Sequence, residues 1–280
     1  HPGETTLLAG GPPCQPFSKS GYWARGDAWR LRDPRAATLQ GFLDLIDAAL
    51  PKVVLLENVQ GILFNGKDEG YRLLLDKIRS TNHRHSVEYQ PSIVRLNSAD
   101  FGVPQLRERV FIVAERSGRV FSAPEPTHRP QSSEVEAKER YRTAWDAIGD
   151  LDSTEWPAHL SPRGKWAKLL PSIPEGENYL WHTSRSGGEP LFGWRRRYWS
   201  FLLKLAKNLP SWTIQADPGP ATGPFHWRSR RLSTRELCRL QTFPDDFEPV
   251  GDYRSCHRQI GKAVPPTIGE LLGCEIRRQL

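Results

Sequence analysis

Two short apolar runs with a helical segment between them constrain the fold of this chain more than any other feature. Thr5 to Ala9 is a β-prone run that ends in the turn Gly10-Gly11-Pro12-Pro13, and Val53 to Leu56 is a second run of four apolar residues. Between them, Ala37 to Leu50 carries apolar residues at helical spacing. A strand, a helix and a strand in this order predict an α/β architecture with a largely parallel sheet.

The later chain divides into a continuation of this pattern, an irregular module and a final ordered part. A second helix is predicted over Tyr71 to Ile78, with strands over Val87 to Val94 and Val110 to Val113. Order resumes at Ser233, where Ser233 to Glu236 has the form of a capping box. We therefore predict a first domain over 1–120, a second module over 121–232 and a return to the first domain over 233–280.

The positive charge of the chain is concentrated in the irregular module. The net charge is +7, yet Ser161 to Arg235 holds 13 basic and 4 acidic residues, whereas the remainder holds 26 basic and 28 acidic residues. Six of the ten tryptophans lie in the same segment, together with Arg195, Arg196 and Arg197. Arginines among aromatic residues suit phosphate contact and base stacking in DNA. The alternatives are a solvated basic face over an aromatic core, or a surface for RNA or an acidic protein.

Several classes of protein are excluded by composition. The longest apolar runs fall far short of the roughly 20 residues that a membrane span requires. The four cysteines show no C-x-x-C spacing, which argues against a disulfide framework or a structural zinc and for a reducing compartment. We predict no metal site, no signal peptide and a cytoplasmic location.

Two polar segments follow the predicted strands and are candidates for chemistry. Cys14 lies in a loop after the first strand, where open α/β sheets place their ligands, so its thiol is either a nucleophile or a small buried side chain. Glu57 and Asn58 end the second strand, at the same edge of the sheet as Cys14 if the two strands are parallel. Glu57 is then either a proton donor or a cap of the next turn.

A third candidate segment, Gln105-Leu106-Arg107-Glu108-Arg109, precedes a later strand. Alternation along an extended chain predicts Gln105, Arg107 and Arg109 on one face. Two guanidinium groups there could hold a phosphate or lower the pKa of a nearby thiol. The alternative is a charged strand edge.

Together and in this order, these segments resemble the motifs of the C5-cytosine DNA methyltransferases. Gly10 to Ser18 resembles the nucleophile loop of that family, Glu57 to Val59 its Glu-Asn-Val motif, and Gln105 to Arg109 its Gln-x-Arg-x-Arg motif. Arg231 to Pro244 and Gln259 to Pro266 resemble its last two motifs. The resemblance implies a Rossmann-like, S-adenosylmethionine-dependent methyltransferase sheet, incomplete at its N-terminus, with 121–232 as a smaller irregular target recognition domain.

The resemblance also implies a mechanism and a set of site residues. Cys14 would attack C6 of a flipped-out cytosine so that C5 can take the methyl group, Glu57 would hydrogen-bond N3 and the exocyclic amine, and Arg107 and Arg109 would steady the base and the Cys14 loop. The residues implied to contact DNA are Gln15, Ser18, Ser20, Arg195, Arg196, Arg197 and Thr213. The residues implied to contact S-adenosylmethionine are Pro12, Leu39, Asn58, Gly261, Ala263 and Val264.

Two departures from the family pattern qualify the resemblance. The Phe-x-Gly-x-Gly turn that binds the cofactor in the family is absent, and the chain contains no methionine. We therefore expect the missing cofactor motifs to precede His1 or to come from a separate N-terminal subunit. Lys262 stands where the family has an asparagine, and a lysine cannot accept a hydrogen bond.

The expected partners are double-stranded DNA and a cognate restriction endonuclease, in a bacterial cytoplasm at the nucleoid. Two other classes of function stay open from the sequence. One is a non-catalytic DNA-binding or regulatory remnant of the family, and the other is a binder of RNA or another polyanion. The set Cys14, Glu57, Arg107 and Arg109 favours the enzyme, because a remnant has no physical need for all four.

Overall fold

The computed structural model describes residues 1–12, 37–65, 68–133, 138–195 and 198–279. The chain splits into two compact units: unit 1 comprises His1–Asn97, Glu108–Glu125 and Leu272–Leu280, and unit 2 comprises Ser98–Arg107 and Pro126–Leu271. Six predicted site residues lie outside the described residues: Cys14, Gln15, Ser18, Ser20, Arg196 and Arg197.

Unit 1 is built on a four-stranded sheet in the order β1-β2-β5-β3. The strands are β1 (Leu7–Gly10), β2 (Val53–Asn58), β3 (Gln90–Asn97) and β5 (Glu108–Glu115). β1 and β2 are parallel. A parallel pair needs a crossover connection, and the helix between the two strands supplies it. The apolar side chains of β2 and β5 are largely buried, which explains their continuous apolar runs.

The direction of β5 differs from the predicted largely parallel sheet. β5 pairs antiparallel with both β2 and β3, so β1, β2 and β3 share one direction and β5 runs against them. Only ten residues separate Asn97 of β3 from its partner Glu108 of β5. A connection too short for a crossover helix favours antiparallel pairing. The prediction of a largely parallel sheet rested on the spacing of apolar residues and did not take the length of this connection into account.

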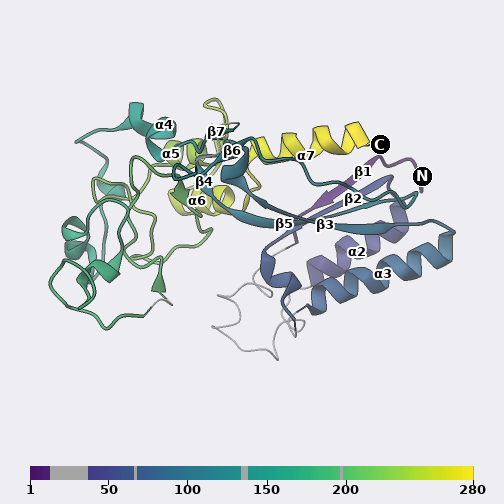
Figure 1. The fold of residues 1–280 in the computed structure, drawn as a ribbon, viewed down its shortest axis with the longest axis horizontal. Coiled ribbons are helices and arrows are strands. Elements are labelled where there is room, and N and C mark those ends of the chain that lie inside the picture. Colours follow the sequence, from purple (N-terminus) through teal and green to yellow (C-terminus); the bar gives the residue numbers. More distant parts are fainter. Residues whose placement is uncertain (13–36, 66–67, 134–137, 196–197, 280) are drawn as a thin grey trace. The chain divides into compact units, whose positions relative to one another are not determined.

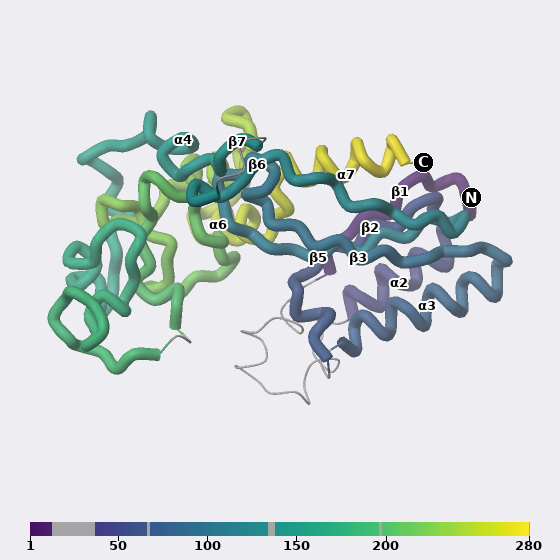
Figure 2. Tube along the Cα trace, in the orientation of Figure 1, coloured from purple at the N-terminus to yellow at the C-terminus, as the bar shows by residue number. Residues whose placement is uncertain are grey.

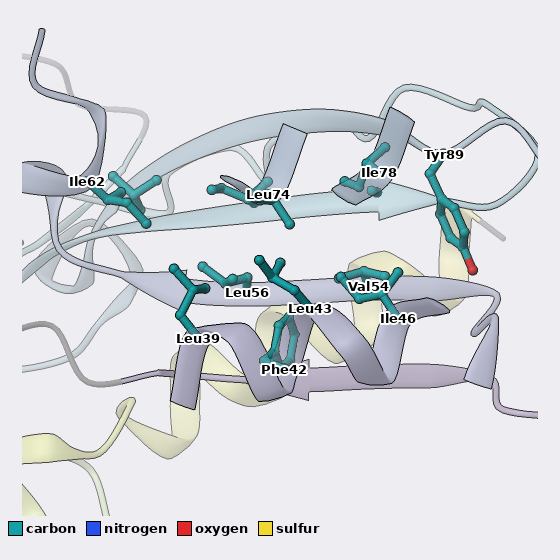
Figure 3. Packing of buried hydrophobic residues seen from close by; sticks show 13 residues of the cluster. Leu39, Phe42, Leu43, Ile46, Val54, Leu56, Ile62, Leu74, Ile78 and Tyr89 are labelled. Carbon is teal, nitrogen blue, oxygen red and sulfur yellow. The ribbon is translucent and has the colours of Figure 1, made fainter. Parts of the chain in front are cut away.

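Two helices cover one face of the sheet of unit 1, as Figure 1 shows. They are α2 (Ala37–Ala49) and α3 (Glu69–His85), with the short 3-10 helix η4 (Gln60–Leu63) before α3. Leu39, Phe42, Leu43 and Ile46 form the buried stripe of α2 and meet Val54 and Leu56 of β2 in the core (Figure 3). Burying each such side chain contributes about 1.5–3 kcal/mol, so this layer holds the carboxyl ends of β1 and β2 in place.

The last turns of α7 (Pro266–Gln279) lie on the other face of this sheet (Figure 1). Within unit 1, Ile276 and Gln279 line a cavity with Val53, Val113 and Phe121. Gln279 also accepts a hydrogen bond from the Ser122 backbone N–H at 2.9 Å through its side chain. No helix in the described ranges is long and apolar enough to cross a membrane.

Unit 2 has little regular structure, as predicted for the basic module, and Figure 2 shows the irregular path of its chain. Its strands are two residues long: β4 (Gln105–Leu106) pairs with β8 (Ser211–Trp212), and β6 (His128–Arg129) pairs with β7 (Glu139–Arg140). Its 3-10 helices are η5 (Ser98–Phe101), η6 (Gly149–Leu151), η7 (Ala158–Leu160), η8 (Ala167–Ser172) and η9 (Tyr179–His182). Hydrophobic clusters rather than long elements therefore hold this unit together.

Three helices give unit 2 its ordered part: α4 (Ala144–Ile148), α5 (Thr234–Leu240) and α6 (Tyr253–Lys262). α5 begins with the predicted capping box, in which the Ser233 hydroxyl accepts from Glu236 N and the Glu236 carboxylate accepts from Ser233 N. Asp252 caps α6 by accepting from Ser255 N at 2.8 Å. These helices belong to unit 2, and unit 1 contains only the C-terminal part of the predicted 233–280 return.

Candidate active site

The candidate site of unit 1 lies where the parallel strands β1 and β2 end. β1 ends at Gly10, and Gly11 and the buried Pro12 follow it toward the loop that carries Cys14. A Cβ atom on Gly11 would lie 3.0 Å from Glu57 Oε2, so a side chain there would press on the Glu57 carboxylate. The absence of a side chain at Gly11 thus lets the chain leading to Cys14 pass directly beside Glu57.

Glu57 and Arg109 form an ion pair at this edge of the sheet. Arg109 Nε lies 3.0 Å from Glu57 Oε1, and each side chain is 15% exposed. Charge-assisted bonds of this kind are stronger than bonds between neutral groups when water is largely kept out. The guanidinium therefore fixes the Glu57 carboxylate in one orientation while leaving it within reach of solvent.

The reversed direction of β5 is what brings Arg109 to Glu57. Glu57 pairs with Phe111 and Asn58 with Val110, so the start of β5 lies beside the end of β2. A parallel β5 would have its first residues at the opposite edge of the sheet. The departure from the predicted parallel sheet thus allows an ion pair between two predicted catalytic residues.

Asn58 is fully buried at the end of β2. Its Oδ1 accepts a hydrogen bond from Val59 N at 2.9 Å, and its Nδ2 has no hydrogen-bond partner among the described residues. A buried amide donor that lacks a partner costs about 1–3 kcal/mol. A polar ligand bound at this edge of the sheet could accept a hydrogen bond from Asn58 Nδ2.

Leu39, also predicted to contact the cofactor, is placed differently. Its side chain is 1% exposed and packs in the core of unit 1 under α2 and β2. It is part of the layer that supports the site. The spacing of the apolar residues of α2 is sufficient to explain its burial.

Arg107 belongs to unit 2 and Arg109 to unit 1, and the single face expected for Gln105, Arg107 and Arg109 stays a prediction. β4 ends at Leu106 and β5 begins at Glu108, so no continuous strand carries the three side chains. Arg107 is 1% exposed, and its Nη2 donates to the carbonyl oxygens of Gly261 and Ala263 at 3.0 and 2.9 Å. Its Nη1 donates to Ile214 O at 3.4 Å. The guanidinium therefore links the segment of Arg107 to two distant backbone segments of unit 2, one at Ile214 and one at Gly261 to Ala263.

Gln105 and Thr213 extend the same network. The Gln105 side chain donates to Leu240 O at 3.3 Å and accepts from Ile214 N at 3.2 Å, and it is fully buried. Thr213 Oγ1 donates to Leu106 O at 2.7 Å. The segment around Thr213, which the family resemblance places beside the target base, is therefore held by the Gln-x-Arg-x-Arg segment.

The predicted cofactor residues Gly261, Ala263 and Val264 lie in unit 2 at the end of α6. A Cβ on Gly261 would lie 2.7 Å from Gln215 O and from Ala216 Cα, so only glycine allows this close backbone approach. Lys262, the departure from the family pattern, is exposed. The two carbonyls that flank Lys262 accept the Arg107 hydrogen bonds, so this turn is fixed without the side chain at position 262.

The tryptophans of the basic module serve two purposes. Trp166 packs with Phe192 and Phe201 at centroid distances of 5.1 and 5.9 Å, and Trp227 is buried. Within 161–235 the exposed ones are Trp194, Trp199 and Trp212, which are 44%, 41% and 36% exposed. Arg195 is exposed as well. An aromatic core and an exposed set of aromatic and basic side chains thus occur in the same unit.

The sequence analysis did not identify two arginines that the structure places in an ion pair and in the lining of a cavity. Arg230 forms a bidentate ion pair with Glu236 at 2.7 and 2.8 Å, with both side chains buried, so Glu236 does more than cap α5. Arg254 lines a cavity together with Arg231. A basic residue in the first turn of α6, where acidic residues are usual, was the signal available for Arg254.

A family model and two curated relatives match this chain. The model of the C-5 cytosine-specific DNA methylase matches residues 2–278. The type II methyltransferase M.SacI of Streptomyces achromogenes is 38% identical over 293 residues, covering 100% of this chain and 73% of the relative. The type II methyltransferase M.NgoFVII of Neisseria gonorrhoeae is 36% identical over 267 residues, covering 94% of this chain and 67% of the relative.

Solved structures with the same fold include the Schizosaccharomyces pombe Dnmt2 methyltransferase. It aligns with a TM-score of 0.58 at 16% identity and covers 98% of this chain and 78% of its own. The Entamoeba histolytica methyltransferase EhMeth aligns with a TM-score of 0.56 at 14% identity, with 98% and 77% covered. These likenesses confirm the predicted methyltransferase fold class.

Proposed function

Since the chain belongs to the C-5 cytosine-specific DNA methylase family, we propose that Cys14, Glu57 and Arg109 carry out cytosine C5 methylation in this protein. The family acts on DNA, and S-adenosylmethionine supplies the methyl group that C5 accepts. The observation that supports the proposal is the Glu57–Arg109 ion pair beside Gly11, three residues before Cys14. It brings a carboxylate with a fixed orientation to the segment that bears the nucleophile.

The reaction begins with the thiolate of Cys14, which forms a bond to C6 of the cytosine. The π electron pair of the C5–C6 double bond shifts to the C4–C5 bond, the π pair of C4–N3 moves onto N3, and a protonated Glu57 gives its proton to N3 as this charge develops. The ring then has a nucleophilic C5. After methylation, a base removes the C5 proton, the C5–C6 double bond is restored, the Cys14 thiolate leaves and the N3 proton returns to Glu57.

Glu57 and Arg109 have distinct roles in this scheme. Glu57 hydrogen-bonds N3 and the exocyclic amine, which selects cytosine over thymine because thymine has an oxygen in place of the amine. Arg109 orients the carboxylate through the 3.0 Å contact. We assign Arg107 as a positioning residue, because its guanidinium holds Gly261, Ala263 and Ile214 through their carbonyl oxygens.

The residues at the carboxyl ends of β1 and β2 fit a polar cofactor. Asn58 Nδ2, which has no partner among the residues that the structure describes, offers a buried donor, and Pro12, two residues after β1, is buried. We propose that Pro12 and Asn58 hold part of S-adenosylmethionine, with contacts from Gly261, Ala263 and Val264. The family's Phe-x-Gly-x-Gly turn would then be supplied by further residues of the protein or by a separate subunit.

Unit 2 is the proposed DNA-binding part. Arg195, Arg196 and Arg197 are proposed to contact phosphates, Thr213 to lie beside the target base, and Gln15, Ser18 and Ser20 to close on the DNA. The two relatives are type II methyltransferases, which supports a bacterial restriction-modification setting with a cognate endonuclease. We propose that the protein acts on chromosomal DNA and is therefore located in the cytoplasm, at the nucleoid.

A methyl-transfer assay tests the proposed function. The protein, supplied with the Phe-x-Gly-x-Gly cofactor segment of the family in cis or as a separate polypeptide, is expected to transfer labelled methyl groups from S-adenosylmethionine to duplex DNA. The product should be 5-methylcytosine at one short sequence, as read by bisulfite sequencing. Sequence-specific DNA binding without any methyl transfer would instead identify a non-catalytic member of the family, and preferential binding of RNA would contradict both.

A further inference from the structure

A cavity of unit 2 lies outside the residues assigned so far. It has a volume of about 110 Å³ and is lined by segment 216–219, by Arg231 and by Tyr253, Arg254 and His257 of α6. All of these residues belong to unit 2. Segment 216–219 begins three residues after Thr213, the residue proposed to lie beside the target base.

The two arginines of this cavity differ from the other arginines around it. Arg228 is paired with Asp152, Arg230 with Glu236 and Arg258 with Asp217. The Arg231 and Arg254 guanidinium groups have no ion pair or hydrogen bond with any residue that the structure describes. Two unpaired guanidinium groups at one cavity repel each other and favour an anion between them.

The carboxylates of the acidic residues near the cavity already have partners within the protein. Asp217, which lines it, accepts from Arg258 Nε at 2.9 Å and lies 2.8 Å from Arg258 Nη2. Asp252 caps α6 by accepting from Ser255 N, and Arg254 helps to lower the pKa of its carboxyl. The cavity therefore keeps a net positive charge after its carboxylates are counted.

The neutral groups of the cavity suit an oxyanion. Thr222 lines it with a hydroxyl, and the positive end of the α6 helix dipole lies at the same place, since Tyr253 is the first residue of α6. Burial lowers the pKa of His257 and Arg231 adds to this, against a hydrogen bond with the Gln215 backbone and the charge of Asp217, which raise it. Guanidinium groups bind phosphate oxygens bidentately, so Arg231 and Arg254 suit a phosphate group as the ligand of this cavity.

We propose that this cavity binds one phosphate group of the DNA backbone through Arg231 and Arg254. This inference rests on the proposed function, because it takes DNA as the ligand of unit 2. Gln215 and Ala216 pack against Gly261, so a phosphate held here fixes the backbone that leads from Thr213 to the cavity. The contact positions the DNA and reads no base.

The test is the salt dependence of DNA binding by an Arg231→Gln/Arg254→Gln double variant. Each phosphate contact contributes about 0.9 to the slope of log K against log salt concentration. The double variant is expected to lose about 0.9 of slope, and the single Arg254→Gln most of that amount. Arg79→Gln, which removes one exposed charge from α3 of unit 1, is the matched control and should leave the slope unchanged. An unchanged slope in the double variant would overturn the proposal.

A second arm separates a backbone phosphate from a free phosphate ion. A duplex scanned with single neutral methylphosphonates should show one position that weakens binding by the wild-type protein and leaves the double variant unaffected. Stabilisation of the wild type by inorganic phosphate without any such position would assign the cavity to a free ion and contradict the backbone contact. Arg254 is exposed, so its variant should keep the wild-type urea midpoint and remain interpretable.

Failure of this inference is distinguishable from failure of the proposed function. Wild-type protein that binds no DNA contradicts the function itself. Wild-type protein that binds and methylates DNA, beside a double variant with the same salt slope and no sensitive methylphosphonate position, contradicts only the phosphate cavity.

Discussion

Replacing Glu57 with glutamine is expected to lower the rate of cytosine methylation by about 10²–10³-fold, the usual effect of losing one group that stabilises charge in a transition state. Glutamine keeps the shape of the side chain and a donor toward N3, but it has no proton to give. The loss should appear in single-turnover methylation with bound DNA, while DNA affinity stays close to that of the wild type.

Glu108→Gln is the matched control for this prediction. Glu108 lies at the start of β5, next to Arg109, and accepts a hydrogen bond from Gln60 at 3.0 Å. It carries the same charge close to the site and has no role in the reaction proposed here. A Glu57→Gln protein that methylates within about tenfold of the wild type would remove Glu57 from the proton transfer.

Replacing Arg107 with methionine is expected to lower the free energy of unfolding by at least about 3 kcal/mol, because three carbonyl oxygens, two of them in buried hydrogen bonds, would each lose a donor at about 1–3 kcal/mol apiece. These are the carbonyls of Gly261, Ala263 and Ile214. Urea denaturation followed by tryptophan fluorescence reports on unit 2, which contains eight of the ten tryptophans.

Arg95→Met on β3 is the control, because Arg95 is exposed and such substitutions change stability by less than about 0.5 kcal/mol.

Arg107→Lys separates a positioning role from a catalytic one, since an ammonium group cannot reproduce the planar fork that reaches three carbonyls. Its activity should fall in parallel with its stability. A variant with the wild-type urea midpoint and a large loss of turnover would show direct contact of Arg107 with the base.

Much of unit 1 follows from local pattern. The apolar spacing of α2 and the apolar run of β2 predicted both elements within one or two residues, because each must bury a defined face. The capping box at Ser233 predicted the start of α5 for a similar reason, since both of its hydrogen bonds form between residues three apart.

The direction of β5 depends on strand pairing that local pattern does not contain. β5 joins β2 along one side and β3 along the other, and only these partners determine that Arg109 faces Glu57. The strand is interrupted at Arg107, between Leu106 and Glu108, and the period-2 pattern of this segment did not reveal the break.

The cavity of Arg231 and Arg254 was beyond sequence reasoning for the same physical reason. The two arginines are 23 positions apart, and the acid that neutralises Arg258 comes from segment 216–219. Which arginines are paired and which are left for a ligand is decided by the tertiary fold. Counting charges along the chain showed where the basic module lies, but it could not show where its charge is unpaired.

The central claim is that Cys14 forms a covalent bond to cytosine, and trapping on a duplex that contains 5-fluorocytosine tests it most directly. Fluorine at C5 cannot leave as a proton does, so the Cys14–C6 bond persists after methyl transfer. With S-adenosylmethionine and the complete cofactor motifs present, the wild-type protein is expected to form a complex that survives denaturing electrophoresis. Cys14→Ser should bind the same duplex and form none. Failure of the wild type to form the complex, or its formation by Cys14→Ser, would contradict the account.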